Sequence, residues 1–187
     1  WRMLQDNFYL KQYPRALANS VAHPASILED MKSFAAMYKA VLEEMQLHVR
    51  VCERLGISSE DMESTMESRA TVAYTRFFLD VADEGLLPLM ISLASCAVGY
   101  AEVGLWLEKE RDTGRMHPSS VYNEWVSEYA GDAYQNSIAN YVELVEDYAQ
   151  RIAVSESQAA RLQQVWDAAT RFEIGMWDEA LSVGSHA

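Results

Sequence analysis

Apolar residues recur every three or four positions along most of this 187-residue chain, which is the spacing of amphipathic helices. No segment shows the sustained alternation of apolar and polar residues that predicts a strand. Breaks at glycine, proline and capping serine residues predict helices over residues 1–21, 28–55, 72–82, 85–107, 119–130, 138–148 and 155–177, with a short turn beginning at Ser58. The pattern therefore predicts an all-α protein, a compact bundle of about seven helices.

Residues 85–107 form the most apolar stretch, and they carry a single charge, Glu102. A membrane span needs roughly 20 predominantly apolar residues and flanks with a bias of lysine and arginine. Here the uncharged run ends at Ala101, small and polar residues interrupt it, and the flanks lack that bias. We therefore predict a helix buried at the centre of the bundle rather than a membrane span.

Composition narrows the classes of partner. The length suits one domain over residues 1–187, and half of the residues are hydrophobic. The net charge of -13 argues against nucleic-acid and membrane partners, because an acidic surface repels phosphate. Two cysteines, Cys52 and Cys96, make no disulfide framework, which favours a reducing, cytoplasmic setting.

Cys96 lies in the central stretch, with Tyr100 four residues later on the same face. A free cysteine in an apolar helix usually only packs, and Cys52 fits that interpretation. Cys96 differs in its neighbours, since Gly99 and other small residues leave room around it.

A metal site is the next possibility, because Glu44 and His48 are four residues apart on one helix. A di-iron bundle requires a second acid-and-histidine pair, and the remaining histidines supply none. We interpret Glu44 and His48 as a polar contact or an exposed i,i+4 pair, and we predict no metal site and no cofactor. The chain also lacks a phosphate-binding glycine loop, a GxSxG elbow and a CxxC motif.

Three carboxylates sit among apolar neighbours: Asp6, Glu102 and Glu173. A buried carboxylate must be hydrogen-bonded or serve a function, because leaving a polar group unpaired costs roughly 2–7 kcal/mol and a charge more. The pattern alone does not decide between these two roles.

Several of these residues fall in segments that resemble the TenA family, the thiaminase II or aminopyrimidine aminohydrolase group. Residues 4–10 resemble its Gln-Asp-x-x-Tyr-Leu motif, and residues 73–75 its Ala-Tyr-Thr motif. Residues 96–104 resemble the nucleophile segment Cys-x-x-Gly-Tyr-x-Glu-x-Gly. Residues 117–130 resemble its His-Pro…Tyr-x-x-Trp…Tyr-Ala stretch, and residues 172–178 its closing Glu-x-x-Phe-Trp motif. The similarity spans nearly the whole chain in order, although the family's first helix has no counterpart in it.

This resemblance implies a heme-oxygenase-like helical fold, a small-molecule aminopyrimidine substrate and a homo-oligomer, either a dimer or a tetramer. It implies that Cys96 is the nucleophile, Glu173 the acid and Asp6 the anchor of the pyrimidine. It implies further that the substrate pocket is lined by Tyr9, Tyr74, Tyr100, Tyr129 and Met176. The implied reaction is hydrolysis at the methylene beside a 4-amino-2-methylpyrimidine ring, which releases the hydroxymethylpyrimidine used in thiamin salvage.

The chain departs from the family pattern at Met176, where an aromatic residue is usual, and in a longer loop at residues 110–117. Three hypotheses follow. The first is hydrolysis of thiamin or of its 5-aminomethyl breakdown product through a covalent cysteine intermediate. The second is a protein that binds or transforms another small molecule in a specialised pathway. The third, which depends on Glu44 and His48, is a metal-dependent oxidase.

Overall fold

The computed structural model describes residues 1–22, 28–115 and 123–184, and these residues contain helices and no strand. The helices are α1 (Arg2–Val21), α2 (Leu28–Arg54), α3 (Ser59–Ser64), α4 (Arg69–Ala82), α5 (Leu86–Asp112), α6 (Asn123–Ala130), α7 (Asp132–Arg151) and α8 (Glu156–Gly184). The predicted all-α class is confirmed. The predicted caps at Ser119 and Ser120 lie outside the described residues.

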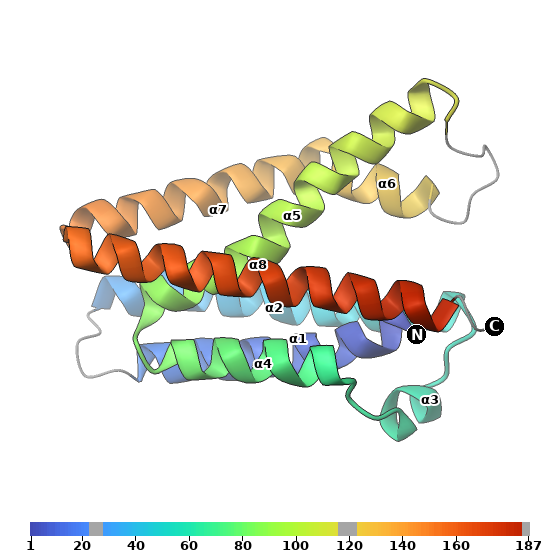
Figure 1. Cartoon of the computed structure of the whole chain (residues 1–187), viewed down its shortest axis with the longest axis horizontal. Helices are drawn as coiled ribbons and strands as arrows, with labels where there is room; N and C mark the ends of the chain where they lie inside the picture. Colours follow the sequence, from blue (N-terminus) through green and yellow to red (C-terminus); the bar gives the residue numbers. More distant parts are fainter. Residues whose placement is uncertain (23–27, 116–122, 185–187) are drawn as a thin grey trace.

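The central stretch forms α5, which crosses the molecule diagonally in Figure 1. It packs against α4, α6, α7 and α8, and it also contacts α1. In the described ranges α5 is the one helix long and apolar enough to cross a membrane, yet 56% of its apolar window is buried inside the protein. The prediction of a buried core helix is confirmed, because other helices cover α5 on several sides.

The core forms where α1, α4, α5 and α8 meet. Its fully buried large side chains include Leu17, Tyr74, Phe78, Leu89, Met90, Leu93 and Met176. On the other side of α5, Figure 1 shows α6 and α7, which join at Gly131, the predicted interruption. The core thus packs the helices that carry Cys96, Glu173 and Asp6 against one another.

Two helix boundaries follow from local chemistry that the sequence shows. Gly56 ends α2 with φ +77°, and Gly85 precedes α5 with φ +115°, both backbone conformations that favour glycine. The turn predicted at Ser58 proves to be a complete short helix, α3. A capping box forms there, because the Ser58 side chain accepts from Asp61 N while the Asp61 carboxylate accepts from Ser58 N. The described chain therefore has eight helices rather than about seven.

A hydrogen-bond network fixes the start of α4 against α1 and α8. The Gln5 side chain accepts from Ser68 N at 2.9 Å and from the Thr71 hydroxyl at 2.7 Å, and it donates to Met66 O at 3.1 Å. From α8, Glu179 accepts from the Ser68 hydroxyl at 2.6 Å. Gln5 is only 1% exposed, so these hydrogen bonds are buried. They hold α1 in place at the residue that directly precedes Asp6.

Candidate active site

Asp6 and Glu173, which are far apart in sequence, are brought together by an arginine. Nη2 of Arg2 lies 3.3 Å from Asp6 Oδ1 on the same helix and 3.3 Å from Glu173 Oε1 on α8. The same nitrogen donates a hydrogen bond to the Tyr100 hydroxyl on α5. Cys96 lies one turn before Tyr100 and interacts electrostatically with Glu173, Arg2 and Asp6. We call Arg2, Asp6, Cys96, Tyr100 and Glu173 the acid–thiol cluster.

Glu173 is the most enclosed carboxylate of the cluster, with 8% of the residue exposed. Its Oε1 accepts a hydrogen bond from Trp177 Nε1 at 3.0 Å, one turn along α8. Burial raises the pKa of Glu173, while Arg2 and hydrogen bonds from Trp177, Cys96 and Tyr74 partly oppose the increase. A carboxyl with a raised pKa beside a thiol can both accept and return a proton near neutral pH.

The Cys96 side chain is half-buried, and space remains beside it. A Cβ built on Gly99, three residues later on α5, would meet nothing within 4 Å. Burial raises the pKa of the Cys96 thiol well above its ordinary value, and the nearby Glu173 carboxylate adds to that increase. The thiol is therefore protonated at neutral pH, and it needs a proton acceptor before it can act as a nucleophile.

Asp6 retains partial access to solvent, with 20% of its side chain exposed. Burial raises the pKa of its carboxyl to about 6, against the attraction of Arg2, while Glu173 and Glu44 raise it further. Near neutral pH the ionised form can accept hydrogen bonds from an amine, and the protonated form can donate one to a ring nitrogen.

Aromatic rings close one side of the cluster next to α4. The Tyr9 ring centroid lies 5.3 Å from that of Tyr74 and 5.2 Å from that of Phe78. The Tyr74 hydroxyl pairs with the Ser95 hydroxyl at 2.9 Å, directly before Cys96 in the chain. The Tyr9 hydroxyl is buried without a partner of standard hydrogen-bond geometry in the described residues, although its proximity lowers the pKa of Cys96. This side therefore offers a phenol close to the thiol.

A second aromatic group lies next to α6. Tyr100 contacts Trp125, Tyr129 and Trp177, with ring centroids 5.6, 5.1 and 5.7 Å away respectively. The rings of Trp125 and Tyr129 lie 4.4 Å apart. Flat surfaces of this kind suit a planar heterocycle such as a pyrimidine. Trp125 and Trp177 were not among the predicted site residues, although both lie in segments that resemble motifs of the family.

Met176 is 1% exposed and belongs to the apolar core that also contains Tyr9 and Tyr74. Met176 therefore lies one turn after Glu173 on α8, in the apolar core next to the acid–thiol cluster. The part of the predicted loop at residues 110–112 is helical, because α5 continues to Asp112. Residues 113 and 114 follow as a turn, with Gly114 at φ +73°, and residues 116–117, including His117, lie outside the described residues.

Two other candidates do not join the cluster. Glu102, which was singled out for its apolar neighbours in the sequence, lies on an exposed face of α5. His48 is buried, but its Nε2 lies 3.5 Å from the Cys52 sulfur, and it is hydrogen-bonded to the Met3 backbone. In the residues that the structure describes, no three His, Cys, Asp or Glu side chains converge as metal ligands.

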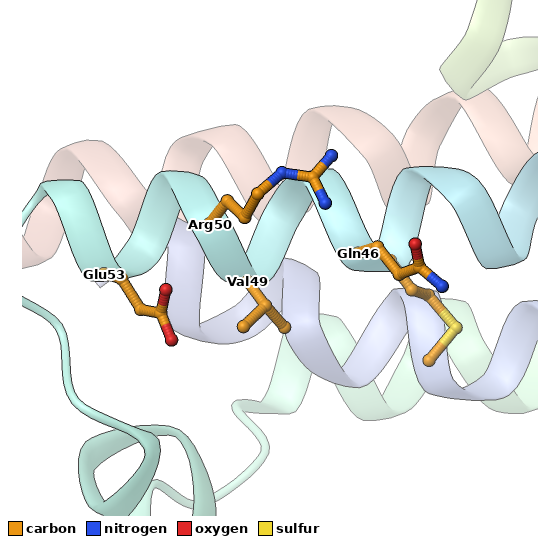
Figure 2. A pocket seen from close by; sticks show the side chains of 5 residues that line it. Gln46, Val49, Arg50 and Glu53 are labelled. Atoms are coloured by element: carbon orange, nitrogen blue, oxygen red, sulfur yellow. The ribbon is translucent and has the colours of Figure 1, made fainter.

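A surface depression on α2 is lined by Met45, Gln46, Val49, Arg50 and Glu53. Figure 2 shows these side chains along the outer side of a single helix. None of them belongs to the acid–thiol cluster, so this depression has no part in the site described above.

Arg2 is the residue of the acid–thiol cluster that the sequence analysis missed. It has no place in the recognised motifs, but it precedes Asp6 by four residues, the spacing of a helical ion pair. A search for a cation four residues from Asp6 would therefore have identified Arg2. Its contact with Glu173 depends on the packing of α1 against α8 and has no sequence signal.

Comparison with known proteins identifies the family. The family model described as TENA/THI-4/PQQC matches residues 3–182. An aminopyrimidine aminohydrolase of Halalkalibacterium halodurans is 32% identical over 95% of this chain and 78% of its own length. An uncharacterized protein of Haemophilus influenzae is 32% identical over 96% of this chain and 81% of its own length.

Solved structures agree. The crystal structure of a TenA family transcription regulator from Silicibacter superimposes with a TM-score of 0.80 at 34% identity, covering 96% of this chain and 80% of that one. A TenA homologue from Pyrococcus horikoshii gives a TM-score of 0.80 at 24% identity, with the same coverage, and this likeness concerns the fold alone. The predicted heme-oxygenase-like fold is confirmed. The family model matches nearly the whole chain, and the chain shares the fold of a TenA relative, so it belongs to the TENA/THI-4/PQQC family.

Proposed function

We propose that this protein is a hydrolase of aminopyrimidines, which acts on thiamin or on its 5-aminomethyl breakdown product. One observation carries the proposal: Asp6, Cys96 and Glu173, from α1, α5 and α8, meet in one largely buried cluster. The relative from Halalkalibacterium halodurans, named an aminopyrimidine aminohydrolase, supports the choice of substrate class.

The pyrimidine would lie between the two aromatic groups, with its amine and a ring nitrogen facing Asp6. An ionised carboxylate accepts from the amine, and a pKa of about 6 keeps the protonated form accessible. Tyr9, Tyr74, Tyr100 and Tyr129 supply ring faces and hydroxyl groups for a planar, polar ligand.

In the first half of the reaction, Glu173 accepts the proton of the Cys96 thiol, and the sulfur forms a bond to the unsubstituted ring carbon. The displaced electron pair passes through the ring and breaks the bond between the methylene and the leaving nitrogen. Glu173 returns its proton to the departing amine; when thiamin is the substrate, the departing thiazole leaves as a neutral molecule and the proton stays on Glu173. The pyrimidine remains attached to Cys96 with an electron-poor exocyclic methylene.

In the second half, water adds to that methylene and its proton is transferred to Glu173 or, when Glu173 is already protonated, to solvent. The electron pair returns through the ring, the carbon–sulfur bond breaks, and Glu173 gives a proton back to the sulfur. For the aminomethyl substrate, water and substrate become hydroxymethylpyrimidine and ammonia, with the protein unchanged. Covalent catalysis of this kind replaces one difficult displacement by two easier steps.

A second candidate function is binding of a pyrimidine without hydrolysis, and Met176 in place of the usual aromatic residue favours it. Family membership further suggests a homo-oligomer in a cytoplasmic, reducing setting, where Cys96 stays a free thiol. Light scattering at micromolar concentration measures the oligomeric state.

Release of hydroxymethylpyrimidine from each of the two substrates tests the proposal, and calorimetry measures binding in the same samples. We expect turnover by the wild-type protein, and a loss of at least about a hundredfold in Glu173→Gln with binding retained. Binding without any turnover by the wild-type protein would establish the second candidate instead. Neither binding nor turnover would reject both.

A further inference from the structure

We propose that Arg2 is a positioning residue of the active site, a fixed cation that keeps the Glu173 carboxylate ionised and aimed at Cys96 so that it can accept the thiol proton. The inference rests on the proposed function. It assigns control of the ionisation of Glu173 to Arg2, a residue outside the recognised motifs.

The geometry of Arg2 is that of a bridge. A single guanidinium nitrogen reaches the carboxylates of Asp6 and Glu173, each at 3.3 Å, and the Tyr100 hydroxyl. The guanidinium carbon lies 5.0 Å from the Trp177 ring centroid, within the range of a cation–π contact. Four side chains on three helices therefore define the position of this cation.

An ordinary helical ion pair would explain the contact with Asp6 but not the contact with Glu173. The pair of Lys39 and Glu43 on α2 shows the ordinary case, with an N–O distance of 3.7 Å and side chains 78% and 66% exposed. Water screens such a pair, which contributes little. The Arg2 side chain is only 18% exposed, and Glu173 lies 171 residues away in sequence. Water therefore screens the charge of Arg2 far less than that of Lys39.

The charges in the cluster show what Arg2 changes. Two carboxylates share one site, and like charges in proximity raise each other's affinity for protons. Arg2 is the cation that touches both, so its removal leaves the two negative charges to repel each other. Protons then bind more tightly to Asp6 and Glu173. As the pH falls, the Glu173 carboxylate therefore becomes protonated at a higher pH than in the wild-type protein. The other titratable groups that face this pair are Tyr9 on α1, Glu44 and Cys52 on α2, Tyr74 on α4, Cys96 and Tyr100 on α5, and Tyr129 on α6.

The first test measures the thiol without any substrate. Iodoacetamide labels Cys96, and mass spectrometry of the Cys96 peptide separates this signal from Cys52. We expect Arg2→Met to slow labelling about tenfold or more near pH 8.5, since loss of a neighbouring cation raises a thiol pKa by about one unit or more. Arg15→Met is the matched control, because Arg15 is an exposed residue of the same helix whose Nη1 donates to Gln12 Oε1 at 3.1 Å. Equal labelling of Arg2→Met and wild-type protein would overturn the proposal.

The second test uses turnover. In Arg2→Met the acidic limb of kcat/KM should move to higher pH by about 1–3 units, the effect of one opposite charge at this distance. A purely structural role would lower the rate equally at every pH. If the wild-type protein has no turnover, the proposed function fails, while the labelling result still decides the role of Arg2.

Arg2→Lys provides a rescue. It keeps the charge, but it lacks the planar guanidinium that lies over the Trp177 ring, so its charge is held less firmly between the carboxylates. We expect a smaller shift in the same direction, in both labelling and pH profile. If circular dichroism shows that Arg2→Met does not fold, Arg2→Gln, which also removes the charge, carries the test, and wild-type labelling of a folded Arg2→Gln protein would contradict the proposal.

Discussion

Gly104 on α5 provides a sharp test of how the aromatic side of the candidate active site is positioned. A Cβ added at this residue would lie 2.8 Å from the backbone carbon of Tyr129, 2.9 Å from Tyr129 Cβ and 3.0 Å from Ala130 N. None of these atoms can rotate away, so α6 must move. The close approach of α5 and α6 therefore depends on the absence of a side chain at Gly104.

The size of the effect follows from two opposing contributions. Overpacking against a backbone costs typically about 1–3 kcal/mol, and this contact belongs at the upper end because no side chain can yield. Replacing glycine by alanine within a helix returns about 1 kcal/mol. We expect Gly104→Ala to lower the free energy of unfolding by about 1–2 kcal/mol, which for this chain length lowers Tm by roughly 2–8 °C.

Gly99→Ala is the matched control, because it lies on the same helix and its added Cβ would meet nothing within 4 Å. It should stabilise the protein by about 0.5–1 kcal/mol. Thermal and urea unfolding followed by circular dichroism measures both variants. A Gly104→Ala protein as stable as Gly99→Ala would refute the close approach of α5 to α6.

Three further variants test the cluster and its support. Burial raises the pKa of Asp6 from 3.8 to about 6, so between these values this carboxyl binds more protons in the folded chain than in the unfolded chain. Its contribution to stability should fall by up to about 3 kcal/mol as pH rises through this window, and urea titrations across it should show a correspondingly smaller fall for Asp6→Asn. Tyr74→Phe removes the hydrogen bond to Ser95 and should cost about 1 kcal/mol in thermal unfolding; no loss would show that the bond is not formed. Gln5→Leu leaves buried partners at the start of α4 unsatisfied and should cost about 2–4 kcal/mol, with faster amide exchange at Thr71; unchanged exchange there would contradict the role of Gln5 as a link.

The helices could be predicted from sequence because their signals are local. Apolar spacing defined α2 and α5, and Gly56 and Gly85 marked boundaries that require unusual backbone angles. The short helix α3 was underestimated, since it rests on a capping box rather than on an apolar stripe. Which face of a helix is buried was harder to predict: Glu102 has apolar neighbours in sequence, yet its own side of α5 is exposed.

The residues of the candidate active site could be proposed only through family resemblance. Periodicity placed Asp6 and Glu173 on helices but did not say that they would meet, because that contact depends on the packing of α1 against α8. Arg2 shows most clearly what sequence patterns can predict. Its contact with Asp6 follows from the four-residue spacing, whereas its contact with Glu173 is long-range and depends on tertiary packing. Local patterns carry the first kind of information and not the second.

The proposed nucleophile of the hydrolase is Cys96. Its role is tested by the release of hydroxymethylpyrimidine from thiamin and from the aminomethylpyrimidine by wild-type, Cys96→Ser and Cys52→Ser proteins at equal folded concentration. Cys52 is fully buried beside His48, so it controls for the loss of a thiol outside the site. We expect turnover by the wild-type and Cys52→Ser proteins and a loss of at least about a hundredfold in Cys96→Ser. A Cys96→Ser protein that keeps the full rate would contradict the account.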